Sequence, residues 1–421
     1  MLNAENALKK WASIIEHADC DPIQDAYRKS VTAVLLENTE KALQEEQAAL
    51  ANSNYITETT NAAAMGQVAD PVLISMVRRA MPQLIAYDIC GVQPMTGPTG
   101  LIFAMKARQS DGAAGAADSD GTTTTTGDAE LLFDEADGAL SGADATTGKS
   151  AAVGEGAMAN AGFTIEKTTV TALTRSLKAE YTMELAQDLK AVHGLDAESE
   201  LANILSQEIL AEINREVIKE IRNAAFTGAV GSSDSGNFDL IVDADGRWAV
   251  ERFQSLAFQL EKESNAILVG DGNANSATRR GKGNFAVVHS DVASALAAAG
   301  RLSTEGVLNT PDYGQNTFVG QMGNMKVYVD PYAASGDVIV GYRGAGAYDA
   351  GFFYAPYVPL TMVKAVSEEN FQPRIAFKTR YGTAHNPIVG AVNTADGTIS
   401  PGANPYFRNL SVTSINDLTG S

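Results

Sequence analysis

One uninterrupted helical pattern in the middle of the chain constrains the shape of the molecule. Asp196 precedes the pattern as a capping residue, and Glu198 and Glu200 complement the positive end of the helix dipole. Large apolar residues then recur at every fourth position, at Leu201, Leu205, Ile209, Ile213, Val217 and Ile221. The pattern predicts a helix within residues 196–226, and about 28 residues at ~1.5 Å each span roughly 42 Å. Such a length is typical of a spine that crosses a flattened subunit.

The first 50 residues predict a second helical region. Their apolar residues are spaced three or four apart, at Leu8, Trp11, Ile14 and Ile15 and again at Tyr27, Val31, Val34 and Leu35. This spacing predicts amphipathic helices with one face to bury. Residues 48–69 carry small and polar side chains, and we expect an exposed linker there. Asp70 followed by Pro71 predicts the start of a further helix.

The rest of the chain mixes loops, strands and helices. Residues 108–168 are rich in Gly, Ala, Thr and Asp, which predicts either a floppy insertion or an extended hairpin that reaches a neighbouring subunit. Residues 248–260 predict an amphipathic helix, and Asp291 starts a short helix that ends near residue 299. Short strands are expected at residues 284–289, 326–329 and 338–342. The expected fold class is therefore α+β.

Composition narrows the class of protein. A chain of 421 residues favours two or three compact units, and no stretch approaches the ~18 to 20 apolar residues that a membrane span requires. The first residues lack the pattern of a secretory signal, so synthesis in a cytoplasm is expected. Cys20 and Cys90 predict two ordinary thiols. The formal net charge of -20 predicts that the chain repels phosphate backbones and anionic membranes.

Two stretches resemble cofactor-binding motifs, but neither matches the complete pattern. Residues 142–150 end in Gly148-Lys149-Ser150, but the spacing of their glycines is one residue too long for a phosphate-binding loop. Residues 154–159 fit a dinucleotide pattern without the required strand and helix around it. The four histidines, His17, His193, His289 and His385, stand singly, which is not the spacing of a metal pair. We therefore expect no enzyme activity, no catalytic residue, no metal and no cofactor.

Basic residues cluster on this acidic background. The candidates for contacts between subunits are Arg78, Arg79, Arg374, Lys378 and Arg380, and a further cluster lies at residues 279–282. In a chain that self-assembles, such clusters can meet acidic patches on another copy and fix its register. The alternative is that they are ordinary solvated charges.

Several long stretches resemble the major capsid proteins of T-even-type (T4-like) tailed bacteriophages. They lie at residues 76–100, 177–217, 349–360, 370–373 and 377–382. One of them reads Asp349-Ala-Gly-Phe-Phe-Tyr-Ala-Pro-Tyr-Val-Pro-Leu360. With matching spacing between them, they cover most of residues 70–390, too much of the chain for a coincidence of motifs.

The resemblance implies the HK97-like major capsid fold. Residues 1–58 would be a cleaved N-terminal propeptide that interacts with the scaffold, residues 59–95 an N-terminal arm, and residues 96–170 an extended loop. Residues 171–226 would form the peripheral domain with its long spine helix, residues 227–365 the axial domain, and residues 366–421 the return to the peripheral domain. In the extended loop, larger members of the family carry an insertion domain, whereas this chain keeps a short Gly- and Thr-rich remnant.

The resemblance also implies trimming of the precursor by a prohead protease that favours Ile or Leu, any residue, and then Glu. Ile56-Thr-Glu58 matches this preference and makes Thr59 the new first residue. The same pattern also ends at Glu16, Glu37, Glu45, Glu212 and Glu220. The last two lie within the predicted long helix, where a protease cannot bind an extended strand. Exposure in the linker therefore favours Glu58.

The function implied is that of a structural protein of the virion. The chain would form homo-hexamers and self-assemble into a whole icosahedral or prolate shell, and it would enclose double-stranded DNA without sequence-specific binding and without a membrane. The partners implied are the pentamer-forming vertex protein, the scaffold, the prohead protease, the portal and possible decoration proteins.

Other functions stay open at this point. The pentamer-forming vertex paralogue shares the fold and the trimming signal, and a cellular nanocompartment shell is a more distant variant. A soluble nucleotide-handling enzyme could be argued from the two Gly-rich stretches, and a glycan-binding surface protein from the Thr-rich loop. Lys106 and Lys149 lie in the loop region, but nothing identifies a partner for a covalent cross-link, and none is expected.

Overall fold

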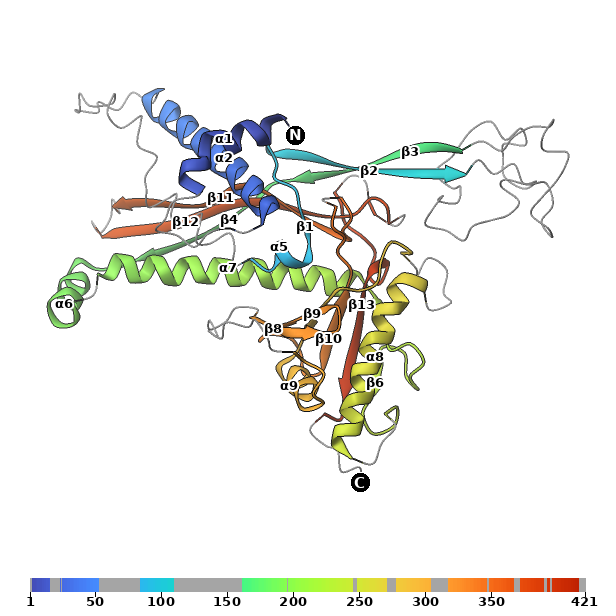
Figure 1. The fold of residues 1–421 in the computed structure, drawn as a ribbon. Coiled ribbons are helices and arrows are strands. Elements are labelled where there is room, and N and C mark those ends of the chain that lie inside the picture. The colour runs from blue at the N-terminus through green and yellow to red at the C-terminus, as the bar shows by residue number, and fades with distance from the viewer. Residues whose placement is uncertain are drawn as a thin grey trace, which may run out of the picture.

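The long helix α7 is the axis on which the chain is arranged (Figure 1). It runs from Ala197 to Ala224, and its N-cap Asp196 accepts a hydrogen bond from the Glu198 amide at 3.4 Å, so the predicted helix and cap are confirmed. The computed structural model describes residues 2–15, 23, 25–52, 84–109, 161–194, 196–244, 248–270, 278–303, 317–346, 348–366, 372–389, 392–393 and 396–415.

One face of α7 packs against a four-stranded sheet. The strand order is β1 (Gly91–Val92), β11 (Phe352–Val366), β12 (Pro373–His385) and β4 (Leu173–Glu180), with β1 parallel to β11 and the other neighbours antiparallel. The apolar residues predicted every fourth position do face the core from Leu205 onward, and they share one cluster with Tyr354 and Phe377. The short helix α5 (Ala86–Ile89) belongs to the same core.

A second sheet begins directly after α7. Its order is β5 (Ala225–Thr227), β13 (Asn404–Thr413), β10 (Asp337–Gly341), β7 (Phe285–Val288), β9 (Met325–Val329) and β8 (Thr317–Met322), and β6 (Asn237–Asp239) also pairs with β13. The helices α8 (Ala249–Val269) and α9 (Ser290–Ala298) pack on this sheet through Leu256, Leu260, Val292 and Leu296. Helices and strands are thus mixed within each body, and the expected α+β class is confirmed.

The predicted elements of this second body are present, with two corrections. The three predicted strands are β7, β9 and β10. The helix expected to end at residue 260 continues to Val269, because Ile267 and Ala266 still pack in the body. The helix expected to start at Asp291 starts at Ser290, because the ring Nδ1 of His289 accepts from the Asp291 amide at 3.3 Å and acts as the cap.

A two-stranded hairpin projects beyond the first sheet (Figure 1). It consists of β2 (Thr99–Gln109) and β3 (Ala161–Thr171), paired antiparallel from Thr99 and Thr171 outward. At its root, Gly382 of β12 lies so close to β3 that a Cβ atom there would come within 2.5 Å of Val170 Cγ1. Glycine at this position therefore lets the hairpin sit directly on the sheet. Residues 110–160, which include Lys149 and both Gly-rich stretches, lie outside the described residues.

The N-terminal helices dock on the first sheet. α1 (Leu2–Ile15) packs on α2 (Ala26–Asn52), and α2 contacts β11. The helices are confirmed, but the single buried face expected for α2 is wrong between residues 31 and 39. There Thr32, Ala33, Leu36, Asn38 and Thr39 are buried as well as Val31 and Leu35. The reason is that α2 has α1 on one side and β11 on another.

Polar contacts fix this docking. Asn38 Nδ2 donates to the carbonyl oxygens of Met95 at 2.8 Å and Tyr357 at 3.0 Å. The Tyr27 hydroxyl donates to the Val92 carbonyl, and the Arg28 guanidinium pairs with the Asp88 carboxylate. The linker predicted from residue 48 is wrong over residues 48–52, because α2 continues to Asn52. The rest of the linker, the helix predicted at Asp70 and Cys20 lie outside the described residues. Cys90 is a buried free thiol, as expected.

No helix in the described ranges combines the length and the apolar character that crossing a membrane requires.

Asn214 offers a test of how α7 is held. Its side chain is buried, and its Oδ1 accepts from the Ile85 amide at 3.1 Å. Replacing Asn214 with alanine leaves that amide buried without its partner, so we expect the free energy of unfolding to fall by about 1–3 kcal/mol. Urea denaturation of the purified chain measures it. Asn203→Ala, at an exposed position of the same helix, is the control and should change stability by less than about 0.5 kcal/mol. Equal effects would contradict the role of this hydrogen bond.

Candidate functional site

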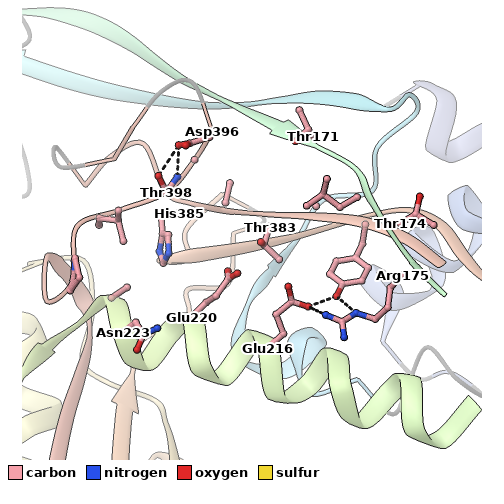
Figure 2. Close-up of a pocket in the computed structure, with 18 residues that line it drawn as sticks. Thr171, Thr174, Arg175, Glu216, Glu220, Asn223, Thr383, His385, Asp396 and Thr398 are labelled. Atoms are coloured by element: carbon pink, nitrogen blue, oxygen red, sulfur yellow. Dashed lines mark hydrogen bonds and ion pairs between the residues drawn. The ribbon is translucent and has the colours of Figure 1, made fainter. Parts of the chain in front are cut away.

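A cavity of about 630 Å³ opens where α7, β12 and the root of the hairpin meet. We call it the junction pocket, and Figure 2 shows α7 along one side of it with the strands opposite. Its polar lining comes from every part of the chain that meets here: Thr171, Thr174, Arg175, Glu216, Glu220, Asn223, Thr383, His385, Asp396 and Thr398. The pocket is thus shared between segments that are far apart in the sequence.

Arg175 is the centre of the pocket's charge network. It comes from β4, and its guanidinium donates to Glu212 Oε2 and Glu216 Oε2 of α7, each at 2.5 Å. Its Nε also donates to the Tyr381 hydroxyl at 3.0 Å, and that hydroxyl donates to Glu216. Charge-assisted hydrogen bonds of this kind are stronger than neutral ones. Burial, together with the hydrogen bond to Glu216, raises the pKa of Tyr381, so its hydroxyl keeps its proton. One side chain of the sheet is therefore tied to two carboxylates of the helix.

Glu220 lies one turn further along α7. Burial is the main cause that raises the pKa of its carboxyl, the nearby Glu216 carboxylate raises it further, and a hydrogen bond from Thr383 acts in the opposite direction. Asp396 on the opposite rim is exposed and accepts from the Thr398 amide at 3.1 Å and from its hydroxyl at 2.7 Å. These hydrogen bonds lower the pKa of Asp396. Asp396 therefore shapes the loop at the rim, while Glu220 belongs to the interior.

His385 closes the inner end of the pocket. Its ring is packed on Phe352, with centroids 4.8 Å apart, and its Nδ1 lies 3.3 Å from Asn404 Nδ2. The same Asn404 nitrogen donates to the Gly351 carbonyl at 3.0 Å, and Asn404 Oδ1 accepts from the Tyr406 amide. Burial lowers the pKa of His385 to about 4, so the ring is neutral at physiological pH. Its place is that of a packed, hydrogen-bonded core residue.

The polar side chains of the junction pocket bind one another and so hold segments of the same chain together. Its carboxylates accept from Arg175, Tyr381 and Thr383, so the groups that could act as bases are already engaged with the chain itself. Across the described part of the chain, no three His, Cys, Asp or Glu side chains gather as metal ligands. The network holds α7 against β4 and β12 of the first sheet.

The residues predicted from sequence fall into two groups. Ile56, Glu58, Thr59, Arg78 and Arg79 lie outside the described residues. The other three, Arg374, Lys378 and Arg380, all lie on β12. They are separated by even numbers of residues, so their side chains share one face of the sheet.

This basic face of β12 consists of Arg374, Lys378 and Arg380, all half-buried. Arg374 Nε lies 2.8 Å from Glu180 Oε1, and the Arg380 guanidinium lies 5.2 Å from the centroid of the Tyr357 ring. Lys106 of the hairpin, considered for cross-linking, is buried with its Nζ 3.6 Å from Glu166 Oε2. The basic side chains thus also make contacts within their own copy.

Sequence reasoning missed the network around Arg175. Its members are 37, 41 and 206 residues apart from Arg175 along the chain, so no spacing brings them together. It also missed the exposed apolar residues of the hairpin, although Leu101, Phe103 and Met105 alternate in the printed sequence as a strand face does. That alternation was a usable signal.

Comparisons with known proteins agree with one another. The family model described as "Major capsid protein Gp23" matches residues 67–412. The major capsid protein of Salmonella phage ViI is 37% identical over 454 residues, covering 97% of each chain. That of Enterobacteria phage T4 is 33% identical over 521 residues, covering 97% of this chain and 98% of the relative.

Two further matches are more distant. The capsid vertex protein of Enterobacteria phage T4 is 27% identical over 266 residues, covering 58% of this chain and 57% of the relative. Among solved structures, the capsid of Helicobacter pylori bacteriophage KHP30 matches with a TM-score of 0.41 and 7% identity, covering 76% of this chain and 86% of that chain.

His385 predicts an acid limit to stability. Its pKa falls from 6.5 to about 4 on folding, so the unfolded chain binds the proton first as the pH falls. The stability it contributes is present above pH 6.5 and is lost between pH 6.5 and 4, by up to about 3 kcal/mol. We expect His385→Gln to flatten the pH dependence of the free energy of unfolding in this window. His193→Gln, at an exposed residue of the helix α6 (Met183–His193), is the control. An unchanged acid limb in His385→Gln would contradict the assignment.

Proposed function

The chain belongs to the family of Gp23 major capsid proteins, and from this premise we propose that its copies form the hexameric capsomers of an icosahedral or prolate phage head. Family membership over residues 67–412 is the observation that carries the proposal. The protein is a structural component of the tailed-phage capsid, and its place is in the virion. The hexamer and the outline of the head are the finer parts of the proposal.

Similarity favours the hexamer-forming protein over the pentamer-forming vertex paralogue. The major capsid relatives are 33% and 37% identical over nearly the whole chain, whereas the vertex protein is 27% identical over 58% of it. Because an assembly role is distributed over the whole surface of a subunit, similarity along the full length is the better guide. We therefore assign the chain to the shell's hexamers.

We propose that successive segments of the chain form different parts of the subunit. Residues 59–95 are the N-terminal arm, and residues 96–170, which contain β2 and β3, are the extended loop. Residues 171–226 and 366–421 form the peripheral domain around α7, and residues 227–365 form the axial domain. Two observed features limit these boundaries. β11 spans residues of the axial range yet pairs with β12 beside α7, and β13 belongs to the second sheet.

We further propose the partners of the assembly. The shell would engage the vertex protein, the scaffold, the prohead protease, the portal and decoration proteins. A net charge of -20 supports enclosure of DNA without a tight grip on it, because acidic surfaces repel phosphate groups. Such a shell lets DNA be packed and later released.

Basic side chains are proposed at contacts between subunits. Arg374, Lys378 and Arg380 share one face of β12, and Arg78 and Arg79 of the arm would add to them. On a chain with 51 acidic and 31 basic residues, a row of like positive charges has acidic surface to meet on any neighbouring copy. Contacts of this kind contribute register more than affinity.

Trimming after Glu58 would change the subunit substantially. It would remove α1 and α2, which bury Trp11, Ile15, Leu35 and Leu36 in the main core. It would also remove the side chains of Tyr27, Arg28 and Asn38, which hold residues 88–95. We propose that the propeptide keeps the arm junction fixed until cleavage releases it.

Mass spectrometry of purified particles tests the proposal first. We expect the most abundant protein to begin at Thr59, because Ile56-Thr-Glu58 fits the protease preference. Intact mass and N-terminal sequence measure the start, and band intensity measures abundance. A start at Met1 would contradict trimming, and a low copy number would favour the vertex role.

Hydrogen exchange tests the propeptide's role. The Gln93 and Met95 amides donate to the Tyr354 and Pro356 carbonyls in the segment that α2 covers. Without α2, we expect these amides to exchange at least about tenfold faster in residues 59–421 than in the full chain, equivalent to ~1.4 kcal/mol of local stability. The amides of β7 in the second sheet are the control. Equal rates at residues 93 and 95 would show that α2 does not hold them.

A further inference from the structure

The short helix α5 lies between the start of α2 and the second sheet (Figure 1). On one side, the Arg28 guanidinium of α2 pairs with the Asp88 carboxylate of α5. On the other side, Nη1 of Arg343 donates to the main-chain oxygens of Tyr87 and, at 3.0 Å, of Asp88. Asp88 is therefore held by two arginines at once, one at its side chain and one at its main chain.

Arg343 belongs to the second sheet through its main chain. Its amide donates to Asn284 Oδ1 at 3.0 Å, and Asn284 Nδ2 donates back to its carbonyl oxygen at 2.5 Å, directly before β7. The preceding Tyr342 amide donates to the Tyr406 carbonyl of β13 at 3.0 Å. The side chain beyond this fixed backbone has several rotatable bonds and five N–H donors. A group that the guanidinium binds is therefore connected to the second sheet.

A cavity of about 460 Å³ opens beside these two arginines. Its lining includes Tyr27 of α2, Asp88 of α5, and Tyr328 and Arg343 of the second body. Burial raises the pKa of Tyr328, the nearby Asp88 carboxylate raises it further, and the positive charges of Arg28 and Arg343 act in the opposite direction. The three charges thus lie around one tyrosine, and the cavity gives a guanidinium room to change its rotamer.

Trimming after Glu58 would remove Arg28 and leave Asp88 and Arg343 in the chain. The Asp88 side chain is 31% exposed, and a partly buried carboxylate that loses its cation is unfavourable. Arg343 Nη1 already lies 3.0 Å from the main-chain oxygen of the same residue, so a change of rotamer brings its guanidinium to the carboxylate. Arginine and carboxylate form strong, charge-assisted hydrogen bonds. The nearest replacement for Arg28 is thus already in contact with α5.

Resting on the proposed trimming of the precursor, we infer that Asp88 exchanges its partner: Arg28 holds its carboxylate in the precursor, and Arg343 takes it over when the propeptide leaves. The exchange replaces a contact with a removable segment by a contact between two permanent parts of the subunit. It ties α5, near the end of the arm, to the second sheet by a side chain as well as by the main chain. Residues 93–95 lose the cover of α2, whereas α5 gains a partner.

Double-mutant cycles in the full chain test the exchange. Arg28→Ala removes the first partner while Tyr27 and Asn38 keep α2 in place. Asp88→Asn and Arg343→Gln, made singly and together, give the coupling between these two side chains as a factor in the unfolding equilibrium constant. We expect a coupling within about threefold when Arg28 is present and of at least about tenfold in the Arg28→Ala chain. Urea denaturation measures it, and equal coupling in both chains would overturn the inference.

Lys41→Ala is the matched control for the loss of a cation from α2. Lys41 is exposed, its Nζ lies 3.3 Å from Glu37 Oε1, and it lies more than three turns further along the helix than Arg28. The coupling between Asp88 and Arg343 should therefore stay at its original value in the Lys41→Ala chain. A rise equal to that in the Arg28→Ala chain would assign the effect to the net charge of α2 and contradict the exchange.

Hydrogen exchange in particles before and after trimming gives a second measurement. The Ile89 and Cys90 amides donate to main-chain oxygens of the α5 turn at 3.1 Å and 3.0 Å. In the unaltered chain, we expect their exchange rates to change less than about threefold on trimming, because Arg343 replaces Arg28. In the Arg343→Gln chain, the same amides should exchange at least about tenfold faster after trimming.

The outcomes separate the two proposals. Subunits that still begin at Met1 in finished particles would contradict the proposed trimming, and the exchange would fall with it. Subunits that begin at Thr59, with equal exchange rates at residues 89 and 90 in the unaltered and Arg343→Gln chains, would leave the trimming in place and show that Arg343 does not take over Asp88.

Discussion

The packing of α7 on the four-stranded sheet is the interaction on which the other parts depend. Ile209 and Val217 are completely buried there, and each such side chain contributes about 1.5–3 kcal/mol when it leaves water. The start of α7 carries α6, and its end leads directly into β5 of the second sheet. The sheet it covers also holds the hairpin root at Gly382 and the N-terminal helices at β11. A shift of this one helix would therefore displace every other part of the subunit.

Apolar packing alone would leave the helix free to slide, and polar contacts fix its position. Asn214 reaches from the buried face to the Ile85 amide, and Arg175 joins Glu212 and Glu216 to the sheet. At the end of α7, Arg222 pairs with Asp337 of the second sheet at 2.6 Å. Each contact is directional, so only one register of helix against strands satisfies all of them.

Much of the fold could be predicted from the sequence because its helices depend on local periodicity. α7, its Asp196 cap and the strands β7, β9 and β10 follow from spacing that a short window contains. The long pairing of β11 with β12, the all-round burial of α2 and the junction pocket depend on contacts between distant residues, which no local pattern encodes. Arg175 illustrates this, because its partners lie on a helix and on a strand that the chain reaches only much later. The start of α9 was predicted one residue too late, because the His289 ring caps the helix before Ser290.

Some apolar surfaces of the subunit are buried within one copy and others stay exposed. This difference indicates which surfaces contact other copies. The N-terminal helices bury their apolar residues within one copy and make specific hydrogen bonds there, so their place is complete before any neighbour arrives. The hairpin and α6 are well formed, by eleven paired positions and by caps at both ends, yet their apolar faces stay uncovered. Order without burial is costly for a monomer, because fixing a backbone costs about 1–2 kcal/mol per residue and burial normally offsets it. Surfaces that are shaped but uncovered are therefore best explained by a neighbouring copy, and the hairpin and α6, at opposite ends of the subunit, are the parts that only the shell completes.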